Sequence, residues 1–428
     1  MNQPVVGFAG MSHLGLVSAA AVAGAGFETV CFDTDPELIA SLRQGALPIV
    51  EPDLAELIKA NGARQRFASS ASELGPCDVV YVALDVTTDS EGSSDTSALK
   101  ALIDSIIPAM HDEAAFVLLS QVEPGFTSAL SSPPQARRYY QVETLIFGRA
   151  VERATKPERY VVGCADPSRP LHPQLKKVLS AFNCPILPMR YESAELAKIS
   201  INCYLVGAVS VANMLAELCE SIGADWSEIV PALKLDRRIG QFAYLAPGLG
   251  IAGGNFERDL GTVRRLTAAN GADAGLVEAW MRISRRRRDW AAKAIQRALL
   301  DRKPGATIAV WGLAYKENTH STKNSASLAT IAQLNGVKIR VHDPVVTADL
   351  IAQQNLTGFD DPLRAAQGAD ALMILTPWPQ YRQVAPLEIA QALSGKIVVD
   401  PYAVLDPAAA AKAGLAYYTL GRGTIATT

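Results

Sequence analysis

A glycine-rich turn near the N-terminus has the residue types and spacing of a dinucleotide phosphate site. Gly10, Ser12 and Gly15 follow an apolar run at 4–9 and open a helical pattern, in the order G-x-S-x-x-G. The first glycine permits a tight turn, the last permits close helix–strand packing, and a small middle residue lets the backbone approach a pyrophosphate. The helix N-terminus adds N–H donors and a positive dipole end. We therefore predict cofactor contacts throughout this turn, at Gly10, Ser12, His13, Leu14 and Gly15.

Asp33, eighteen residues after Gly15, ends the second apolar run and bears on the choice of cofactor. A carboxylate at this place accepts hydrogen bonds from both ribose hydroxyls and repels a 2′-phosphate, so NAD is favoured over NADP. The hydroxyl of Ser12 could add a donor for the phosphates. The alternative is an α/β domain whose glycines serve only packing and whose His13 is merely solvated, as a lone histidine in a turn often is.

Alternating strand-like and helix-like segments must position this turn. Apolar, β-prone runs occupy 4–9, 29–32, 79–84, 115–119 and 160–162, and helical patterns occupy 16–24 and 36–45. Strands separated by helices predict a doubly wound parallel sheet, and their continuous apolar character predicts burial on both faces. The same rhythm returns in strand-like runs at 307–311, 338–342, 371–375 and 397–399. We therefore predict an α/β fold with two Rossmann-like domains.

The middle of the chain has a different pattern. Long helical stretches are predicted at 192–222 and 273–300, with a structured glycine-rich loop at 238–259 between them. Long helices that join two α/β units often form a dimer spine, so a homodimer is expected. The predicted domains are an NAD-binding domain at 1–190, a helical dimerisation domain at 191–303 and a second Rossmann-like domain at 304–428.

Composition excludes several classes of protein. Of 428 residues, 49% are apolar and 19% charged, and the net charge of −3 gives no general attraction to nucleic acid or anionic membranes. Four consecutive arginines at 285–288 wrap around a helix and are expected to form a solvated face or a phosphate-facing subset. The six cysteines are scattered, so neither a zinc site nor a disulfide framework is predicted. With no secretion signal and no membrane span expected, the cytoplasm is the predicted location.

Several short segments, in a shared order over nearly the whole chain, together resemble the UDP-glucose/GDP-mannose dehydrogenase family. Residues 120–125 look like the family's segment near the nicotinamide, and 195–202 like its catalytic helix. Residues 236–240 and 247–250 resemble its sugar-binding loop, and 253–259 occupy its G-G-x-C-F-x-K-D signature. Residues 312–316 match the start of its C-terminal domain, and the resemblance therefore implies that 304–428 binds the nucleotide sugar, UDP-linked in this family. The resemblance implies two successive oxidations of a nucleotide-bound primary alcohol by NAD, with a cysteine thiol carrying the second.

The resemblance also assigns roles to individual residues. Lys198 and Asn202, four apart on one helix face, would stabilise an alkoxide, and Asp259 would orient a water for proton transfer. Without the family context, Lys198 and Asn202 would be interpreted as ordinary solvated residues. The catalytic set is completed by Glu143 and Asn255. Further cofactor contacts are assigned to Thr87, Ser120, Gln121 and Lys323. The assigned substrate contacts are Glu143, Lys198, Arg238, Tyr244, Gly248, Phe256 and Lys316.

The residues that differ from the family pattern are those that the resemblance assigns to the second oxidation. Asn255 stands where the cysteine is expected, and a carboxamide is no nucleophile at neutral pH. In the segment that resembles P-E-F-L-R-E-G, Ile146 and Phe147 replace the arginine and the second glutamate. Cys203 and Cys219 lie on an apolar helix, where an inert buried thiol is expected. No metal site is predicted.

These departures leave four hypotheses open. The first is a dehydrogenase that stops after a two-electron oxidation. The others are an epimerase that uses NAD transiently, a non-catalytic relative that binds nucleotide sugar or NAD, and a four-electron oxidation through an aldehyde hydrate.

Overall fold

A computed structural model describes residues 3–88, 93–252, 254–351 and 356–423. Gly253, the first glycine of the segment at 253–259, lies outside the described residues. The chain divides into two compact units, Met1–Ile201 and Asn202–Thr428, and the boundary falls inside the long helix α8 (Tyr191–Ile222). The division into three domains stays a prediction.

The first unit is built on an eight-stranded sheet with the order β10-β9-β8-β7-β4-β1-β2-β3. All neighbouring pairs are parallel except β8 and β9. The strands are β1 (Val5–Ala9), β2 (Glu28–Phe32), β3 (Gln65–Ala68), β4 (Val79–Val82), β7 (Ala115–Leu118), β8 (Arg138–Gln141), β9 (Tyr160–Cys164) and β10 (Ile186–Arg190). A separate small hairpin pairs β5 (Thr87–Thr88) with β6 (Ser94–Asp95).

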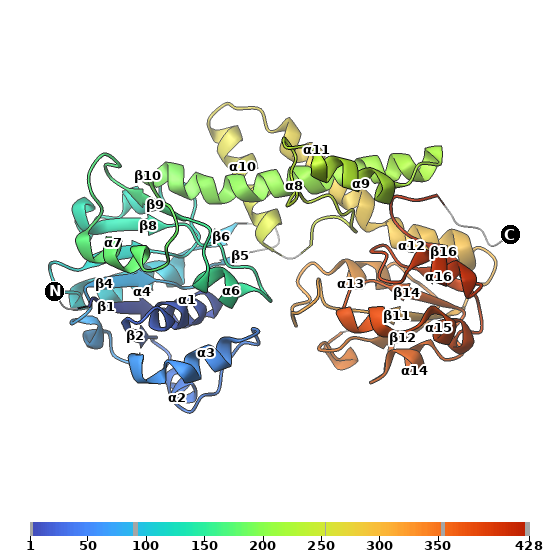
Figure 1. Cartoon of the computed structure of the whole chain (residues 1–428), viewed down its shortest axis with the longest axis horizontal. Helices are drawn as coiled ribbons and strands as arrows, with labels where there is room; N and C mark the ends of the chain where they lie inside the picture. The colour runs from blue at the N-terminus through green and yellow to red at the C-terminus, as the bar shows by residue number, and fades with distance from the viewer. Residues whose placement is uncertain (1–2, 89–92, 253, 352–355, 424–428) are drawn as a thin grey trace. The chain divides into compact units, whose positions relative to one another are not determined.

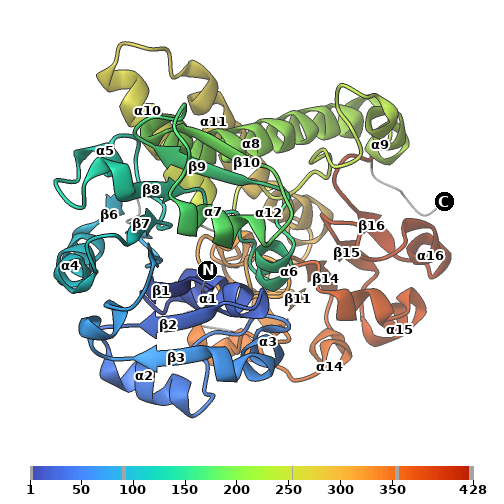
Figure 2. The same ribbon diagram turned by 60° about the vertical axis from the view of Figure 1, so that its left-hand side comes forward.

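Helices cover the faces of this sheet (Figure 1). They are α1 (His13–Gly24), α2 (Pro36–Arg43), α3 (Leu54–Ala60), α4 (Ser97–Ile106), α5 (Phe126–Ala129), α6 (Ala150–Thr155) and α7 (Pro173–Ser180). Figure 2 shows β1, β2 and β3 side by side, and α1 packs against all three. The central strands β4 and β7 are buried at every residue, as their apolar sequences predict.

The second unit combines a helical part with a six-stranded parallel sheet of order β13-β12-β11-β14-β15-β16. The strands are β11 (Thr307–Trp311), β12 (Lys338–His342), β13 (Leu356–Gly358), β14 (Ala371–Ile374), β15 (Ile397–Val399) and β16 (Ala416–Tyr418). The helical part comprises α9 (Trp226–Leu235), α10 (Asn255–Ala269), α11 (Gly275–Arg288) and α12 (Trp290–Ile295). Further helices beside the sheet are α13 (Ala326–Ile331), α14 (Pro362–Ala366), α15 (Pro386–Ala392) and α16 (Pro407–Lys412). The predicted fold class, with two parallel sheets and a long central helix, is confirmed.

Two predictions for the helical middle need correction. The helix expected at 273–300 is interrupted at Asp289, where α11 ends and α12 begins, and it finishes in a π-helical turn at Gln296–Leu300. No glycine or proline marks this interruption, so the sequence pattern gave no sign of it. The loop expected at 238–259 is shorter, because α10 already begins at Asn255.

Helix α8 has a length and apolarity that would also suit a membrane span. By length and composition it is the one such helix among the described residues, and 39% of its most apolar window is buried. Buried polar side chains interrupt its apolar surface, because Glu195, Asn202 and Asn213 are each at most 8% exposed. A long core helix of a water-soluble protein has the same properties.

Candidate active site

The backbone of the glycine turn has the geometry that a dinucleotide phosphate requires. Gly10 has a φ of +95°, and its N–H donates to the carbonyl of Phe32 at 2.9 Å. A Cβ on Gly15 would overlap the carbonyl oxygen of Gly10, so only glycine lets α1 begin this close to β1. These features leave the N-terminus of α1 free of side-chain bulk, which fits a bound pyrophosphate.

The side chains of Ser12 and Asp33 both form hydrogen bonds with the backbone around this turn. The Ser12 Oγ donates to the carbonyl of Ala83 at 3.1 Å, so its proton is directed into the protein and not toward a phosphate. The two oxygens of Asp33 accept the N–H groups of Met11 at 2.6 Å and Asp35 at 3.0 Å. Each carboxylate oxygen has a further lone pair, so Asp33 can still accept the ribose hydroxyls of NAD.

The second unit repeats this arrangement without the phosphate-binding helix. Gly312 has a φ of +94°, and its N–H donates to His342 at 2.8 Å. The N–H of Leu313 donates to Asp343 Oδ2 at 2.6 Å, as Met11 does to Asp33. The following helix, however, begins only at Ala326. The described segment 313–325, which follows this second glycine turn, therefore contains no helix.

His13 is buried and engaged, so the alternative of a merely solvated ring is wrong. Its Nε2 lies 3.0 Å from Glu51 Oε2, and its ring stacks on Phe147 with centroids 4.2 Å apart. The Glu51 carboxylate also accepts the N–H groups of Gly148 at 3.1 Å and Ala150 at 2.8 Å. Glu51 thus ties the start of α1 to the segment at 147–150, a role that sequence reasoning missed because its partners are far away in sequence.

Asp85 is a second acidic residue at the turn that the sequence analysis did not select. Its N–H donates to Ser12 Oγ at 3.1 Å, and its carboxyl interacts with Ser12, His13 and the N–H of Leu14. Protein atoms that keep water away raise the pKa of this carboxyl, while Ser12 and His13 act in the opposite direction. Its place after β4 was the available signal, because ligands of doubly wound sheets bind at the carboxyl ends of strands.

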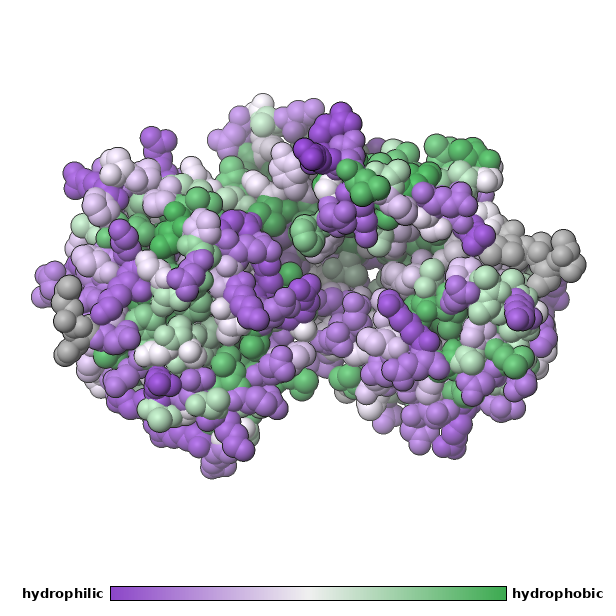
Figure 3. Space-filling view, viewed as in Figure 1, coloured by the Kyte–Doolittle hydropathy of each residue, from purple (hydrophilic) through white to green (hydrophobic). Residues whose placement is uncertain are grey.

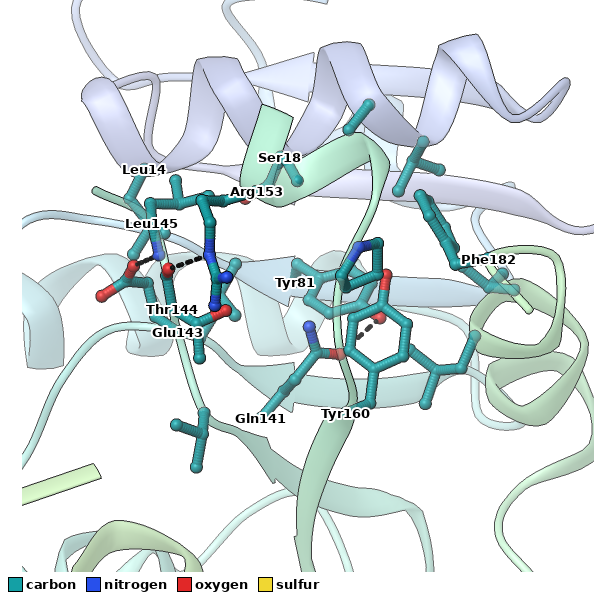
Figure 4. Close-up of a pocket in the computed structure, with 18 of the residues that line it drawn as sticks. Leu14, Ser18, Tyr81, Gln141, Glu143, Thr144, Leu145, Arg153, Tyr160 and Phe182 are labelled. Atoms are coloured by element: carbon teal, nitrogen blue, oxygen red, sulfur yellow. Dashed lines mark hydrogen bonds between the residues drawn. The ribbon is translucent and has the colours of Figure 1, made fainter. Parts of the chain in front are cut away.

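Lys198 and Glu143 form a largely buried ion pair in the first unit. The Lys198 Nζ lies 3.1 Å from Glu143 Oε2, and their side chains are 11% and 16% exposed. The other Glu143 oxygen accepts the N–H of Leu145, and the carbonyl of Thr144 accepts Arg153 Nε at 3.4 Å. Figure 4 shows this segment in a pocket of about 50 Å³ that Tyr81 and Gln141 also line. The ammonium group is therefore held in one place by a fixed carboxylate.

Asn202 and Asp259 form a buried polar pair in the second unit. Asn202 Nδ2 donates to Asp259 Oδ2 at 2.5 Å, and Arg258 Nε donates to Asp259 Oδ1 at 3.2 Å. Asp259 is 2% exposed, so the neighbouring guanidinium compensates its charge. Asn202 lies one helical turn after Lys198 on α8, so the helix carries one member of each pair.

Asn255 is the first residue of α10 and is exposed. The preceding residue, Gly254, packs against the side chain of Lys323, whose Nζ would lie 3.2 Å from a Cβ added there. Glu257, in the first turn of α10, accepts hydrogen bonds from Asn324 and from Arg288 at 3.1 Å. The segment at 323–324 is thus joined to the start of α10.

The remaining predicted residues are spread over both units. In the first unit, Thr87 lies in the β5–β6 hairpin, Ser120 is buried with its Oγ 3.4 Å from the carbonyl of Val82, and Gln121 follows it directly. In the second, Arg238 pairs with Asp236 at 2.6 Å, but its side chain is 88% exposed. The others lie as follows: Tyr244 lines an apolar pocket, the N–H of Gly248 donates to Asn213 at 2.8 Å, Phe256 is half-buried on α10, and Lys316 lies over the Tyr315 ring.

The two thiols on α8 do not have the environment of a nucleophile. Burial raises the pKa of Cys203, and the carboxylate of Asp259 raises it further. Burial also raises the pKa of Cys219. A thiol with a raised pKa carries little thiolate at neutral pH, so neither environment favours a nucleophilic cysteine. Within the described ranges, no group of three or more histidine, cysteine or acidic side chains could hold a metal.

Three segments of the chain match domains of one enzyme family. Residues 5–182 match the NAD-binding domain of the UDP-glucose/GDP-mannose dehydrogenase family, 192–286 its central domain, and 309–407 its UDP-binding domain. The N-terminal segment, with its glycine turn and Asp33, is therefore an NAD-binding domain.

Whole-chain comparisons agree with this match. A UDP-glucose 6-dehydrogenase of Pseudomonas aeruginosa is 29% identical over 96% of both chains. The UDP-glucose 6-dehydrogenase TuaD of Bacillus subtilis is 28% identical over 97% of this chain and 93% of its own. The structure of a UDP-glucose dehydrogenase from Pyrobaculum islandicum superposes with a TM-score of 0.83 at 27% identity, over 93% of this chain and 94% of that one. The chain belongs to the UDP-glucose/GDP-mannose dehydrogenase family.

Proposed function

We propose that this chain is an NAD-dependent nucleotide-sugar dehydrogenase that stops after one two-electron oxidation and releases a carbonyl product. Family membership and the names of its relatives support the dehydrogenase activity on a UDP-sugar or another nucleotide sugar. The observation that carries the early stop is Asn255, at the start of α10, where the family resemblance places a thiol. A carboxamide there provides no covalent route to an acid.

The chain's own residues suit the first oxidation. Bound NAD supplies the hydride acceptor. The alcohol loses one hydride and one proton, and the Lys198 ammonium, held by Glu143, stabilises the alkoxide that forms as the proton leaves. The carboxamide of Asn202, held by Asp259, adds a neutral donor on the same helix. Asp259 orients a water that carries the proton away.

The chain's residues do not suit a second oxidation. An aldehyde becomes a hydride donor again only after a nucleophile adds to it. Asn255 does not add, and the thiols of Cys203 and Cys219 have raised pKa values. Phe147 puts an aromatic ring, stacked on His13, where a second carboxylate would handle the hydrolytic water.

The experiment is a panel of nucleotide sugars incubated with the full-length protein and NAD. We expect one NADH per sugar consumed and a carbonyl product that hydroxylamine traps and mass spectrometry identifies. Asn255→Cys should still release no acid, because Phe147 and Ile146 remain. Two NADH per sugar with a carboxylate product would refute the proposal and indicate a hydrate route. A changed sugar without NADH would indicate an epimerase, and NAD binding without turnover of any sugar would indicate a non-catalytic relative.

We also propose that the protein is a homodimer. The second-unit part of α8 exposes apolar side chains at helical spacing, and these are Tyr204, Val211, Met214, Leu218 and Ile222. Figure 3 shows apolar surface over the C-terminal end of α8 and the neighbouring α9. An exposed apolar stripe of this length is typical of a subunit interface. Sedimentation velocity should show a dimer at micromolar concentration, and Leu218→Glu should shift it to a monomer; a wild-type monomer would contradict the proposal. A cytoplasmic location stays a prediction.

A further inference from the structure

A pocket in the second unit has an excess of positive charge. It has a volume of about 590 Å³ and lies between the C-terminal part of α8, α11–α12 and the segment after β16. These elements are labelled in Figure 1. Six basic side chains line this cationic pocket, and these are Arg286, Arg287, Lys293, Arg297, Arg302 and Arg422. Its acidic lining residues, among those that the structure describes, are Glu217 and Glu220.

Internal ion pairs account for only part of this charge. Arg286 binds Glu217 at 2.9 Å, and Arg287, which is 2% exposed, binds Glu220 at 2.8 Å. The expectation that the arginines at 285–288 form a solvated face is therefore wrong for Arg287. Lys293 pairs with Asp289 at 3.5 Å, and Arg422 pairs with Asp225 at 3.1 Å. Within the described part of the chain, the exposed side chains of Arg297 and Arg302 have no ionic partner.

Glu220 makes the pocket wall rigid. Its Oε1 accepts Arg287 Nη2 at 2.8 Å and the N–H of Gly421 at 2.9 Å, and its Oε2 accepts Trp290 Nε1 at 2.9 Å. One carboxylate therefore joins α8, α11, α12 and the C-terminal segment. Because these groups are already fixed, an incoming ligand finds a preorganised wall and does not have to order it.

Two buried polar atoms in the wall lack a partner. Thr419, 8% exposed, has a hydroxyl with no hydrogen bond, and the Nε of Arg287 likewise has none. An unsatisfied buried donor costs about 1–3 kcal/mol, so such atoms usually indicate a missing partner. Both atoms lie inside the wall, with almost no surface that a ligand could reach. The indication of a ligand rich in acceptor oxygens therefore comes from the guanidinium groups without an ionic partner, beside four paired basic side chains.

We propose that the cationic pocket binds a small molecule that carries a diphosphate or two phosphate groups. Guanidinium groups bind phosphate oxygens through paired hydrogen bonds, and a pocket of this volume holds a molecule of nucleotide size. The pocket shares no residue with those assigned to catalysis, NAD or the nucleotide sugar. A nucleic acid is disfavoured because the charge lies in one pocket of a chain whose net charge is −3.

Calorimetric titration of the full-length protein with inorganic pyrophosphate tests the proposal. Saturating NADH and UDP are present throughout, so that the cofactor and nucleotide-sugar sites are filled. We expect one saturable site per chain, with an affinity that falls as salt rises. The double variant Arg297→Ser/Arg302→Ser should bind about tenfold more weakly or worse, because two charge-assisted contacts are lost.

The control is Arg285→Ser, which removes an exposed arginine of α11 outside the pocket. It has the same effect on net charge as one pocket substitution and should leave the affinity unchanged. Equal affinities in the wild type and the double variant would overturn the proposal, as would an equal loss in the Arg285 control. Tighter binding of a short single-stranded DNA through Arg297 and Arg302 would also overturn it, since the site would then serve a nucleic acid. Circular dichroism confirms that each variant is folded.

Discussion

Replacing Glu51 by glutamine tests whether one buried carboxylate holds the nucleotide turn in place. The Glu51 side chain is fully buried and accepts hydrogen bonds from His13, Gly148 and Ala150. Glutamine keeps the size of the side chain but replaces one acceptor oxygen by an NH₂ group. The substitution therefore changes hydrogen bonding and charge while leaving the packing intact.

The expected loss follows from these three bonds. An NH₂ group at Oε1 would face the N–H of Ala150, and at Oε2 it would face the N–H of Gly148. In either orientation at least one buried backbone donor loses its acceptor, at a cost of about 1–3 kcal/mol. The remaining bonds lose their charge assistance, so we expect a total decrease of about 2–4 kcal/mol in the free energy of unfolding.

Urea denaturation followed by circular dichroism measures the stability, and a fluorescence titration measures NAD binding. Both should weaken in Glu51→Gln, because His13 opens α1 at the phosphate position and the segment at 147–150 loses its anchor. The matched control is Glu56→Gln on the exposed face of α3, which should change neither quantity. If Glu51→Gln unfolds with the same free energy as the wild type, the carboxylate does not have the structural role assigned to it.

Four further changes test the site and the fold. Lys198→Ala should lower kcat about a hundredfold or more, because it removes alkoxide stabilisation, and it should also lower the melting temperature, because Glu143 is left without its partner; a retained rate in the folded variant would contradict this role. Asp33→Ala should weaken NAD binding by about 1.5–3 kcal/mol in a titration, since hydrogen bonds from the ribose are lost, and should reduce the difference between the affinities for NAD and NADP; an unchanged affinity for NAD would contradict a contact between Asp33 and the ribose. Asp85→Asn should tighten NAD binding about three- to tenfold, because a carboxylate beside the phosphates is neutralised. The raised pKa of Asp85 means that wild-type affinity should rise as the pH falls, and a variant with the same pH trend would refute this. Burial lowers the pKa of His342 in the folded chain, so the unfolded chain binds a proton on this imidazole at a higher pH than the folded chain does. The free energy of unfolding should therefore fall as the pH drops from about 7 to about 5. His342→Gln should make the free energy of unfolding, measured by urea denaturation, less dependent on pH, and an unchanged pH dependence would show that His342 is not its source.

Much of the fold could be predicted because it rests on local patterns. The buried strands of both sheets are short apolar runs, and β11, β12 and β15 begin and end where the sequence predicts. Strand β8 was not predicted, although it is buried inside its sheet, because its polar Arg138 and Gln141 interrupt the apolar pattern. Other strands that were not predicted, such as β3 and β10, lie at sheet edges. There one side is open to water, so polar residues and even Pro188 are tolerated and the apolar signal disappears.

The sequence by itself determined the nucleotide turn. Gly10 and Gly15 are required by backbone conformation and by contacts within a few residues, and Asp33 follows at the end of the next strand. Such requirements are readable because the residues that impose them are close along the chain. The cofactor prediction depended on these residues alone and is confirmed by the match to the NAD-binding domain.

Only the tertiary structure decided which polar groups are buried together. Glu51 binds Gly148, 97 residues away, and Arg287 binds Glu220, 67 residues away. A glutamate or an arginine is usually exposed, so the sequence favoured solvated side chains at these positions. Their burial depends on which faces of distant elements meet. A charge enters a protein interior only when a fixed partner is already there to compensate the lost hydration, and no local pattern records that partner.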